Sequence, residues 1–408
     1  MQTPHTKDQI SVLKPAEGEN GLVYNLLLGE LAGRRGDIDV ALESYETASM
    51  LSQDPEVAER ALQIALYSQR WESVESIAKR WISLSPEDTA PHRVLLTAYI
   101  RKGDIEPAVE EAEKVIALSQ TLEKRTYDDL LALFKRVNKP DVTAAIVEKL
   151  VQADAQAASR HFLQARLAAY HGDMPLAEQA VRHTLALEPE HTSALLLEAQ
   201  LLIQQKRTGE GFKVLEEALA RYPDNLGLQL GYARLLVADQ QYDKAIGQID
   251  HIYGENSANG NLVFSLGLLA MESQALEKAE KYLSQAVNLD VRASEANLYL
   301  GRIADNQKKY DKAIAHYARV RHEEGQFEAQ LRIAELMAAQ GKIEPARTHL
   351  SLLRNRYSGV TNQVDFDLSE AEILRQAGRI EEALALLTRS LEARPDDTQL
   401  RYQDHSAT

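Results

Sequence analysis

The sequence predicts an all-α protein in which about eleven helix–turn–helix units follow one another as an α-solenoid. Three observations predict this class: small residues that recur at intervals of roughly 34 residues, apolar residues at helical spacing between them, and turn signals inside many units. A length of 408 residues ordinarily suggests two or three domains, at roughly 150 residues each. A regular period instead indicates one array, whose length is set by the number of repeats.

The recurring small residues define the units. The series is Ala41, Val74, Ala108, Ala144, Ala177, Gly211, Ala245, Ala279, Ala313, Ala346 and Ala383. Twelve residues earlier in each unit lie Gly29, Leu62, Leu96, Ala132, Ala165, Ala199, Ala233, Gly267, Gly301, Ala334 and Ala371. Seven residues later lie Ala48, Trp81, Val115, Val151, Thr184, Ala218, Ile252, Ala286, Val320, Leu353 and Ser390. Because closely crossing helices need little side chain where they meet, these series predict packed helix pairs that must stack on their neighbours.

Turn residues separate the two helices of a unit, as in the unit whose helices are expected over residues 262–271 and 279–289. Glycines stand at five of the turns: Gly36, Gly103, Gly172, Gly341 and Gly378. Three prolines are expected in the first turn of a second helix: Pro107, Pro175 and Pro345. A proline there costs no helical hydrogen bond, because the N–H at that position has no partner within the helix. Prolines that cannot continue a helix close four units, at Pro86, Pro189, Pro223 and Pro395.

The array is expected over residues 22–397, after a flexible leader at 1–21. Residues 398–408 read either as a frayed tail or as the truncated start of a further helix. The Gly-, Asn- and Ser-rich stretch 254–261 and the stretch 357–363 predict longer, looser connections. Since the repeats resume in register on both sides, we interpret both as changes of superhelical path and not as domain boundaries.

Composition excludes several classes of function. The 46 Lys and Arg against 61 Asp and Glu give a net charge of −15, which argues against binding to nucleic acid. The absence of cysteine excludes disulfides, thiol catalysis, iron–sulfur clusters and thiolate zinc sites. No apolar run reaches the roughly 18 residues of a transmembrane helix, and the first 20 residues lack an apolar signal core.

No constellation of catalytic or metal-binding residues stands out. The 11 histidines contain no His-Glu-x-x-His pair, and we expect His161, His171, His183 and His191 at the surface or the rim of a groove. A helical repeat offers no strained turn for a nucleophilic serine. The sequence therefore predicts a protein that is not an enzyme and that holds no cofactor and no metal.

The skeleton of small residues, large intervening residues and closing prolines resembles the tetratricopeptide repeat, from Leu22 to about Asp397. The resemblance implies a right-handed superhelix in which the first helix of each repeat lines a concave groove. It places the following residues in that groove: Leu196, Gln200, Ile203, Leu230, Arg234, Val237, Phe264, Leu268, Met271 and Arg302. Much of this set is apolar for residues expected to face solvent, which favours a protein-binding site. The alternative is that tight curvature buries these side chains against one another.

Some members of that family capture a peptide's terminal carboxylate with a Lys-x-x-x-Asn pair on a first helix. The corresponding positions here are Leu26 and Glu30, Glu59 and Gln63, and Arg93 and Thr97. That clamp is absent, so we do not expect recognition of this type.

Four short stretches resemble a narrower family, the large tetratricopeptide lipoproteins of Gram-negative bacteria. They are LLGELAG at 27–33 running to DVAL at 39–42, DPEVAERA at 54–61, FSL at 264–266 and NLYLGR at 297–302. The resemblance implies an adaptor at the periplasmic side of the outer membrane, which delivers cell-wall hydrolases to a carboxyl-terminal processing protease. The chain departs from that family in having no lipid-acceptor cysteine and fewer C-terminal repeats, as expected of an excised segment whose lipid anchor lies outside it.

The sequence thus predicts a scaffold or adaptor whose partners are proteins or peptides. Two alternatives stay open: a cytosolic scaffold, and the helical interaction domain of a larger enzyme or secretion assembly.

Overall fold

The computed structural model describes residues 19–119, 123–321, 323–357, 363–395 and 400. Within these ranges all regular structure is α-helical, and 22 helices succeed one another as eleven pairs. The prediction of an all-α chain of helix–turn–helix repeats is confirmed. The chain divides into two compact units, of which unit 1 ends at Tyr222 and unit 2 begins at Pro223.

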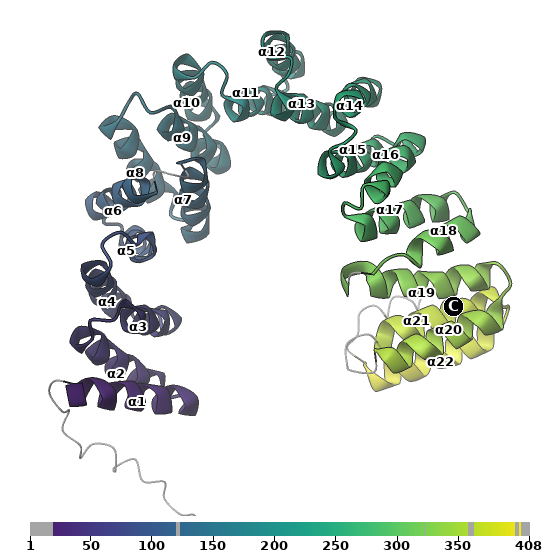
Figure 1. Cartoon of the computed structure of the whole chain (residues 1–408), viewed down its shortest axis with the longest axis horizontal. Coiled ribbons are helices and arrows are strands. Elements are labelled where there is room, and N and C mark those ends of the chain that lie inside the picture. Colours follow the sequence, from purple (N-terminus) through teal and green to yellow (C-terminus); the bar gives the residue numbers. More distant parts are fainter. Residues whose placement is uncertain (1–18, 120–122, 322, 358–362, 396–399, 401–408) are drawn as a thin grey trace, which may run out of the picture. The chain divides into compact units, whose positions relative to one another are not determined.

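Unit 1 contains six helix pairs. Its helices are α1 Glu19–Arg35, α2 Ile38–Leu51, α3 Pro55–Tyr67, α4 Trp71–Leu84, α5 Thr89–Lys102, α6 Ile105–Leu118, α7 Glu123–Val137, α8 Pro140–Ala153, α9 Ala158–His171, α10 Met174–Leu187, α11 Thr192–Gln204 and α12 Thr208–Arg221. The two helices of a pair lie side by side, as α1 and α2 do at the start of the unit (Figure 1).

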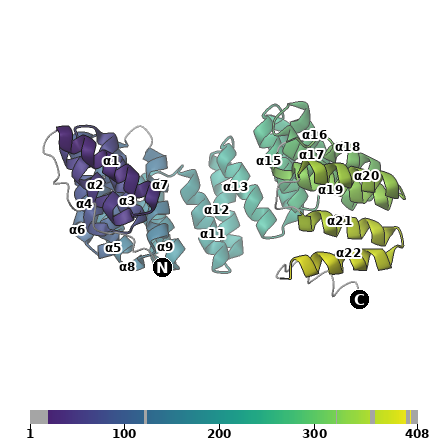
Figure 2. The ribbon, with the colours of Figure 1, turned by 90° about the horizontal axis from the view of Figure 1, so that it is seen from below.

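Unit 2 contains five helix pairs. Its helices are α13 Leu226–Ala238, α14 Tyr242–Asn256, α15 Gly260–Glu272, α16 Leu276–Asn288, α17 Ala293–Asn306, α18 Tyr310–Tyr317, α19 Glu323–Ala339, α20 Ile343–Arg356, α21 Gln363–Gln376 and α22 Ile380–Ala393. The last pair, α21 and α22, also lies side by side (Figure 2).

Small residues let the paired helices approach closely, as the sequence predicts. A Cβ atom at Gly29 would lie 2.6 Å from the ring of Tyr45, and one at Gly301 would lie 2.6 Å from the ring of Tyr317. Both tyrosines stand four residues after the recurring small residue of their repeat. In these pairs a large side chain of the second helix therefore fills the space left by a glycine of the first.

Every hairpin turn within a pair contains one residue with positive φ. Glycine occupies five of these turns, with φ between 75° and 89°, as predicted for Gly36, Gly103, Gly172, Gly341 and Gly378. The other six turns use residues other than glycine, with φ between 54° and 64°: Gln69, Asn138, Lys206, Gln240, Gln274 and Lys308. The same six-residue hydrogen bond closes both kinds of turn, from Asp173 N to Ala168 O and from Arg207 N to Leu202 O, each at 2.9 Å.

The predicted register of the fourth repeat is wrong by one residue. Ala132 and Ala144 are exposed, whereas Leu131, Thr143 and Leu150 are buried at the three recurring positions. The sequence prediction chose Ala144 because alanine is the usual small residue, but Thr143 occupies the small buried position. Its hydroxyl can be buried because it donates a hydrogen bond to Lys139 O within the same helix, at 3.0 Å. The turn before α8 is also irregular in sequence, since Asn138 takes positive φ and Pro140 begins the helix.

The connection expected to be long at 254–261 is short. Helix α14 extends to Asn256 and α15 begins at Gly260, so only three residues separate them. The polar residues cap helices instead of forming a loop, because the Asn259 side chain accepts a hydrogen bond from Leu262 N at 3.2 Å.

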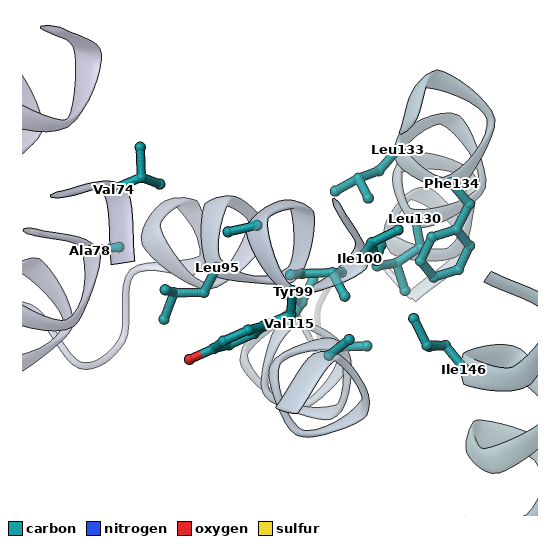
Figure 3. Close-up of a cluster of buried hydrophobic side chains, with 14 of the residues drawn as sticks. Val74, Ala78, Leu95, Tyr99, Ile100, Val115, Leu130, Leu133, Phe134 and Ile146 are labelled. Carbon is teal, nitrogen blue, oxygen red and sulfur yellow. The ribbon is translucent and has the colours of Figure 1, made fainter. Parts of the chain in front are cut away.

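The core of unit 1 runs continuously through several repeats. Figure 3 shows Leu95 and Ile100 of α5 between Val74 of α4 on one side and Phe134 of α7 and Ile146 of α8 on the other. All five side chains are almost completely buried. Each repeat thus completes the core of its neighbour, as stacking requires.

Some sequence predictions lie outside the described residues. These are most of the expected leader, of which 1–18 are not described, and the 398–408 segment apart from Leu400, which is buried. The connection at 357–363 falls mainly on residues 358–362, which are also outside the described ranges. A single uninterrupted array and its right-handed superhelix stay predictions, because the two units are described separately.

Candidate protein-binding site

The first helices of unit 2 carry most of the predicted groove residues. Leu230 on α13 and Leu268 and Met271 on α15 are half-buried, and Arg234 on α13 is exposed. Arg302 lies on α17 and is partly exposed. We call Leu230, Arg234, Leu268, Met271 and Arg302 the unit 2 face.

Two predicted groove residues do not belong to this face. Phe264 is completely buried, and Val237 retains only 9% of its exposure. The guanidinium of Arg292 covers the Phe264 ring, with Cζ 4.0 Å from the ring centroid, while the ring of Tyr299 meets it edge-on at 6.1 Å. The expectation that Phe264 faces solvent is therefore wrong, because neighbouring side chains enclose it.

Arg302 is held in place by two contacts. Its guanidinium donates a hydrogen bond to Glu328 at 2.7 Å, and Cζ lies 5.5 Å from the centroid of the Tyr299 ring. The hydrogen bond to Glu328 raises the pKa of Arg302. Arg302 is therefore a cation with a fixed position within the unit 2 face.

The remaining three predicted groove residues lie on α11 of unit 1. Leu196 and Ile203 are half-buried and Gln200 is exposed, so their first-helix side is accessible. Ile203 also packs toward α12, where its Cγ1 would lie 3.0 Å from a Cβ atom at Gly211. Leu196, Gln200 and Ile203 thus belong to unit 1, whereas the unit 2 face belongs to unit 2.

A cavity that the sequence analysis did not predict lies in unit 1. It has a volume of about 550 Å³ and is formed by α7, α9, the end of α10 and the start of α11. The residues that line it are Tyr127, Asp128, Ser159, Phe162, Arg166, Glu188, His191, Thr192 and Ser193. We call it the unit 1 cavity.

The wall of the unit 1 cavity combines aromatic rings with charges. Arg166 forms an ion pair with Asp128 on the neighbouring first helix. Its Cζ lies 5.5 Å from the centroid of the Phe162 ring, and the ring of His191 lies 4.5 Å from the same ring. Phe162 and Arg166 are four residues apart, so both project from one side of α9. That spacing is the only sequence signal for the cavity, since Asp128 and His191 come from other helices.

The described side chains were expected to include no metal site and to place several histidines at the surface. Within the described ranges no three His, Asp or Glu side chains come close enough to bind one metal ion. His161 is buried, which corrects the expectation of a surface position, and its Nε2 lies 3.0 Å from Ala155 O. None of the helices in the described part of the chain combines the length and hydropathy needed to cross a membrane.

Comparison of the sequence with known families assigns the repeats. Three family models, each described as a tetratricopeptide repeat, match residues 202–266, residues 162–225 and 264–329, and residues 328–359. Within residues 162–359 the sequence thus matches tetratricopeptide repeats. The unit 2 face lies on first helices of such repeats, and first helices supply most of the unit 1 cavity.

A curated relative is the TPR repeat-containing protein PA4667 of Pseudomonas aeruginosa, strain PAO1. It is 29% identical over 383 residues, which are 93% of this chain and 64% of the relative. The chain therefore spans slightly less than two thirds of that relative's length.

Two solved structures are similar to the chain at low sequence identity. Yeast Tom70 has a TM-score of 0.37 at 15% identity, with 94% of this chain and 96% of that chain covered. A tetratricopeptide repeat protein from Parabacteroides merdae has a TM-score of 0.36 at 16% identity, with 59% of this chain and 96% of that chain covered. At scores this low, neither structure indicates how the repeats of this chain are arranged along its length.

Proposed function

We propose that the chain is a non-enzymatic adaptor that binds partner proteins through first helices of its tetratricopeptide repeats. The observation that carries the proposal is the unit 2 face, where Leu230, Leu268 and Met271 stay partly exposed on first helices of the same unit as Arg234 and Arg302. Large apolar side chains that remain accessible next to polar groups are typical of protein-binding surfaces. Tetratricopeptide repeats likewise imply protein partners.

The partner that we propose is a carboxyl-terminal processing protease on the periplasmic side of the outer membrane, to which the adaptor delivers cell-wall hydrolases. The support for it is the resemblance of the stretches at 27–42, 54–61, 264–266 and 297–302 to lipoproteins with that role. The net charge of −15 favours encounter with basic partners and affects the rate of association more than its strength.

The test replaces Leu230, Leu268 and Met271 together by aspartate and leaves Phe264 unchanged, because burying a charge there would disturb the fold. The matched control is Leu352→Asp, since Leu352 is 64% exposed on the second helix α20 of the same unit. Purified chains are incubated with periplasmic extract, and captured protease and hydrolases are identified by mass spectrometry.

The proposal predicts that the triple variant loses at least about tenfold of the captured protease and hydrolases, at unchanged helical circular dichroism, as expected when an interface loses its central apolar contacts. The Leu352→Asp control should capture as much as the unchanged chain. Equal capture by the triple variant would refute the role of the unit 2 face. Capture of other proteins without protease or hydrolases would refute the proposed partner while leaving the adaptor function standing.

A further inference from the structure

The unit 1 cavity has more negative than positive charge. Asp128 and Glu188 contribute two carboxylates, and Arg166 contributes one guanidinium. Asp128 is paired with Arg166, whereas Glu188, which is exposed, has no ion-pair partner among the residues that the structure describes. The cavity therefore has a carboxylate left over for a cation.

His191 does not change this balance. Its Nδ1 accepts a hydrogen bond from Ala194 N at 3.1 Å, at the start of α11. A ring nitrogen that accepts a hydrogen bond carries no proton, so the imidazole is neutral in this arrangement. His191 thus adds an aromatic surface to the cavity without adding positive charge.

The cavity already shows how a guanidinium fits into it. Arg166 lies over the ring of Phe162 while it pairs with the carboxylate of Asp128. Stacking on a ring and pairing with a carboxylate are the two interactions for which the planar guanidinium is best suited. Glu188 and the half-buried ring of His191, which packs against Phe162, offer the same two interactions to a second cation at the wall of the cavity.

We propose that the unit 1 cavity binds an arginine side chain of a partner polypeptide, between the Glu188 carboxylate and the aromatic rings. The inference goes beyond the proposed function, which rests on the unit 2 face. A carboxylate ligand would gain Arg166 but would face Asp128 and Glu188, and an apolar side chain would desolvate Glu188 without compensation. The net charge of −15 also attracts a basic segment over a longer range.

The test titrates the whole chain with N-acetyl-arginine N-methylamide and follows binding by saturation-transfer-difference NMR. The leucine and glutamate analogues of the same probe serve as competing chemistries. Glu188→Gln removes the unpaired carboxylate, and Glu190→Gln is its matched control, because Glu190 is exposed two residues away but does not line the cavity. Arg166→Ala removes the resident cation and makes the Asp128 carboxylate available to the probe.

The two variants should change binding in opposite directions. We expect Glu188→Gln to weaken the arginine probe about fivefold and Arg166→Ala to strengthen it severalfold, with Glu190→Gln unchanged, and we expect added salt to weaken binding. The triple aspartate variant of the unit 2 face should bind the probe as the unchanged chain does. Preference for the glutamate probe with loss in Arg166→Ala would overturn the proposal, as would equal binding of the arginine probe by Glu188→Gln.

Discussion

The two accessible surfaces on the first helices differ in chemistry although they belong to the same kind of repeat. The unit 2 face presents Leu230, Leu268, Met271 and two arginines, whereas the unit 1 cavity presents Phe162, an ion pair and an unpaired carboxylate. Beneath both surfaces, small buried residues occupy the same position of the repeat, such as Ala165 in α9 and Ala233 in α13. The repeat fold therefore constrains the side of a first helix that meets the second helix, and leaves the other side free to vary.

The boundary between core residues and accessible residues is sharpest within α15. Phe264 is fully buried and Leu268, one turn later, is half-buried. Phe264→Ala should destabilise the chain by about 3–5 kcal/mol because it leaves a cavity, whereas Leu268→Ala should cost about 1 kcal/mol or less. Urea unfolding followed by circular dichroism measures both. Similar losses for the two variants would show that Leu268 belongs to the core and would remove it from the unit 2 face.

Variants of the hairpin turns test whether different repeats share the same turn backbone. Gly172 has a φ of 82°, with open space where a Cβ atom would lie, and Lys206 has a φ of 64° in the next repeat. Gly172→Ala should destabilise by about 1 kcal/mol, because a left-handed backbone is unfavourable for a residue with Cβ. Lys206→Gly should stabilise by about 0.5 kcal/mol, since the relief of that strain exceeds the entropy that glycine loses.

Lys206→Ala is the control for the turn, because it shortens the side chain and keeps Cβ. We expect its midpoint of urea unfolding to stay within error of the unchanged chain. A rise equal to that of Lys206→Gly would attribute the gain to the lost charge and not to the backbone.

Surface ion pairs between repeats should contribute least. Hydrogen bonds from Lys102 on α5 and Lys79 on α4 lower the pKa of Glu75 to about 2. The unfolded chain binds the Glu75 proton near pH 4.3, so the pair stabilises the fold above that pH and the stabilisation is lost as pH falls toward 2. Because both lysines are more than a third exposed to solvent, Glu75→Gln should cost only about 0.5 kcal/mol at pH 7 and very little at pH 2.

Urea unfolding at several values of pH measures this difference. Glu72→Gln on the same helix is the control, since Glu72 is exposed and has no ion pair in the described part of the chain. A loss for Glu75→Gln that stays constant from pH 7 to pH 2 would contradict the assignment to the ion pair.

The sequence predicts the scaffold well because the scaffold is periodic. The small residues from Ala41 to Ala383 and the five turn glycines identify eleven helix pairs, and only the fourth repeat misplaces them. The error arises because Thr143 satisfies its own hydroxyl and so replaces alanine at a buried position. Turns such as that at Lys206 escape prediction because no glycine marks them, although the backbone is the same.

The accessible surfaces are predicted less well because they depend on side chains from different helices. Helical spacing places Phe264 on the same side of α15 as Leu268, but Arg292 and Tyr299 from farther along the chain bury it. The unit 1 cavity brings Asp128, Phe162 and His191 together from three helices, with no common motif. A repeat pattern fixes which residues form the core, and it does not fix which of the others remain uncovered.

The proposed adaptor function requires that the unit 2 face contact a partner directly. The most direct measurement places a photo-crosslinking residue at Leu268 or, as a control, at Leu352, and identifies the crosslinked proteins from the periplasmic side of the outer membrane. We expect crosslinks to a carboxyl-terminal processing protease or a cell-wall hydrolase from position 268 and none from position 352. The same crosslinks from both positions, or none from position 268 while capture persists, would show that the unit 2 face does not contact the partner.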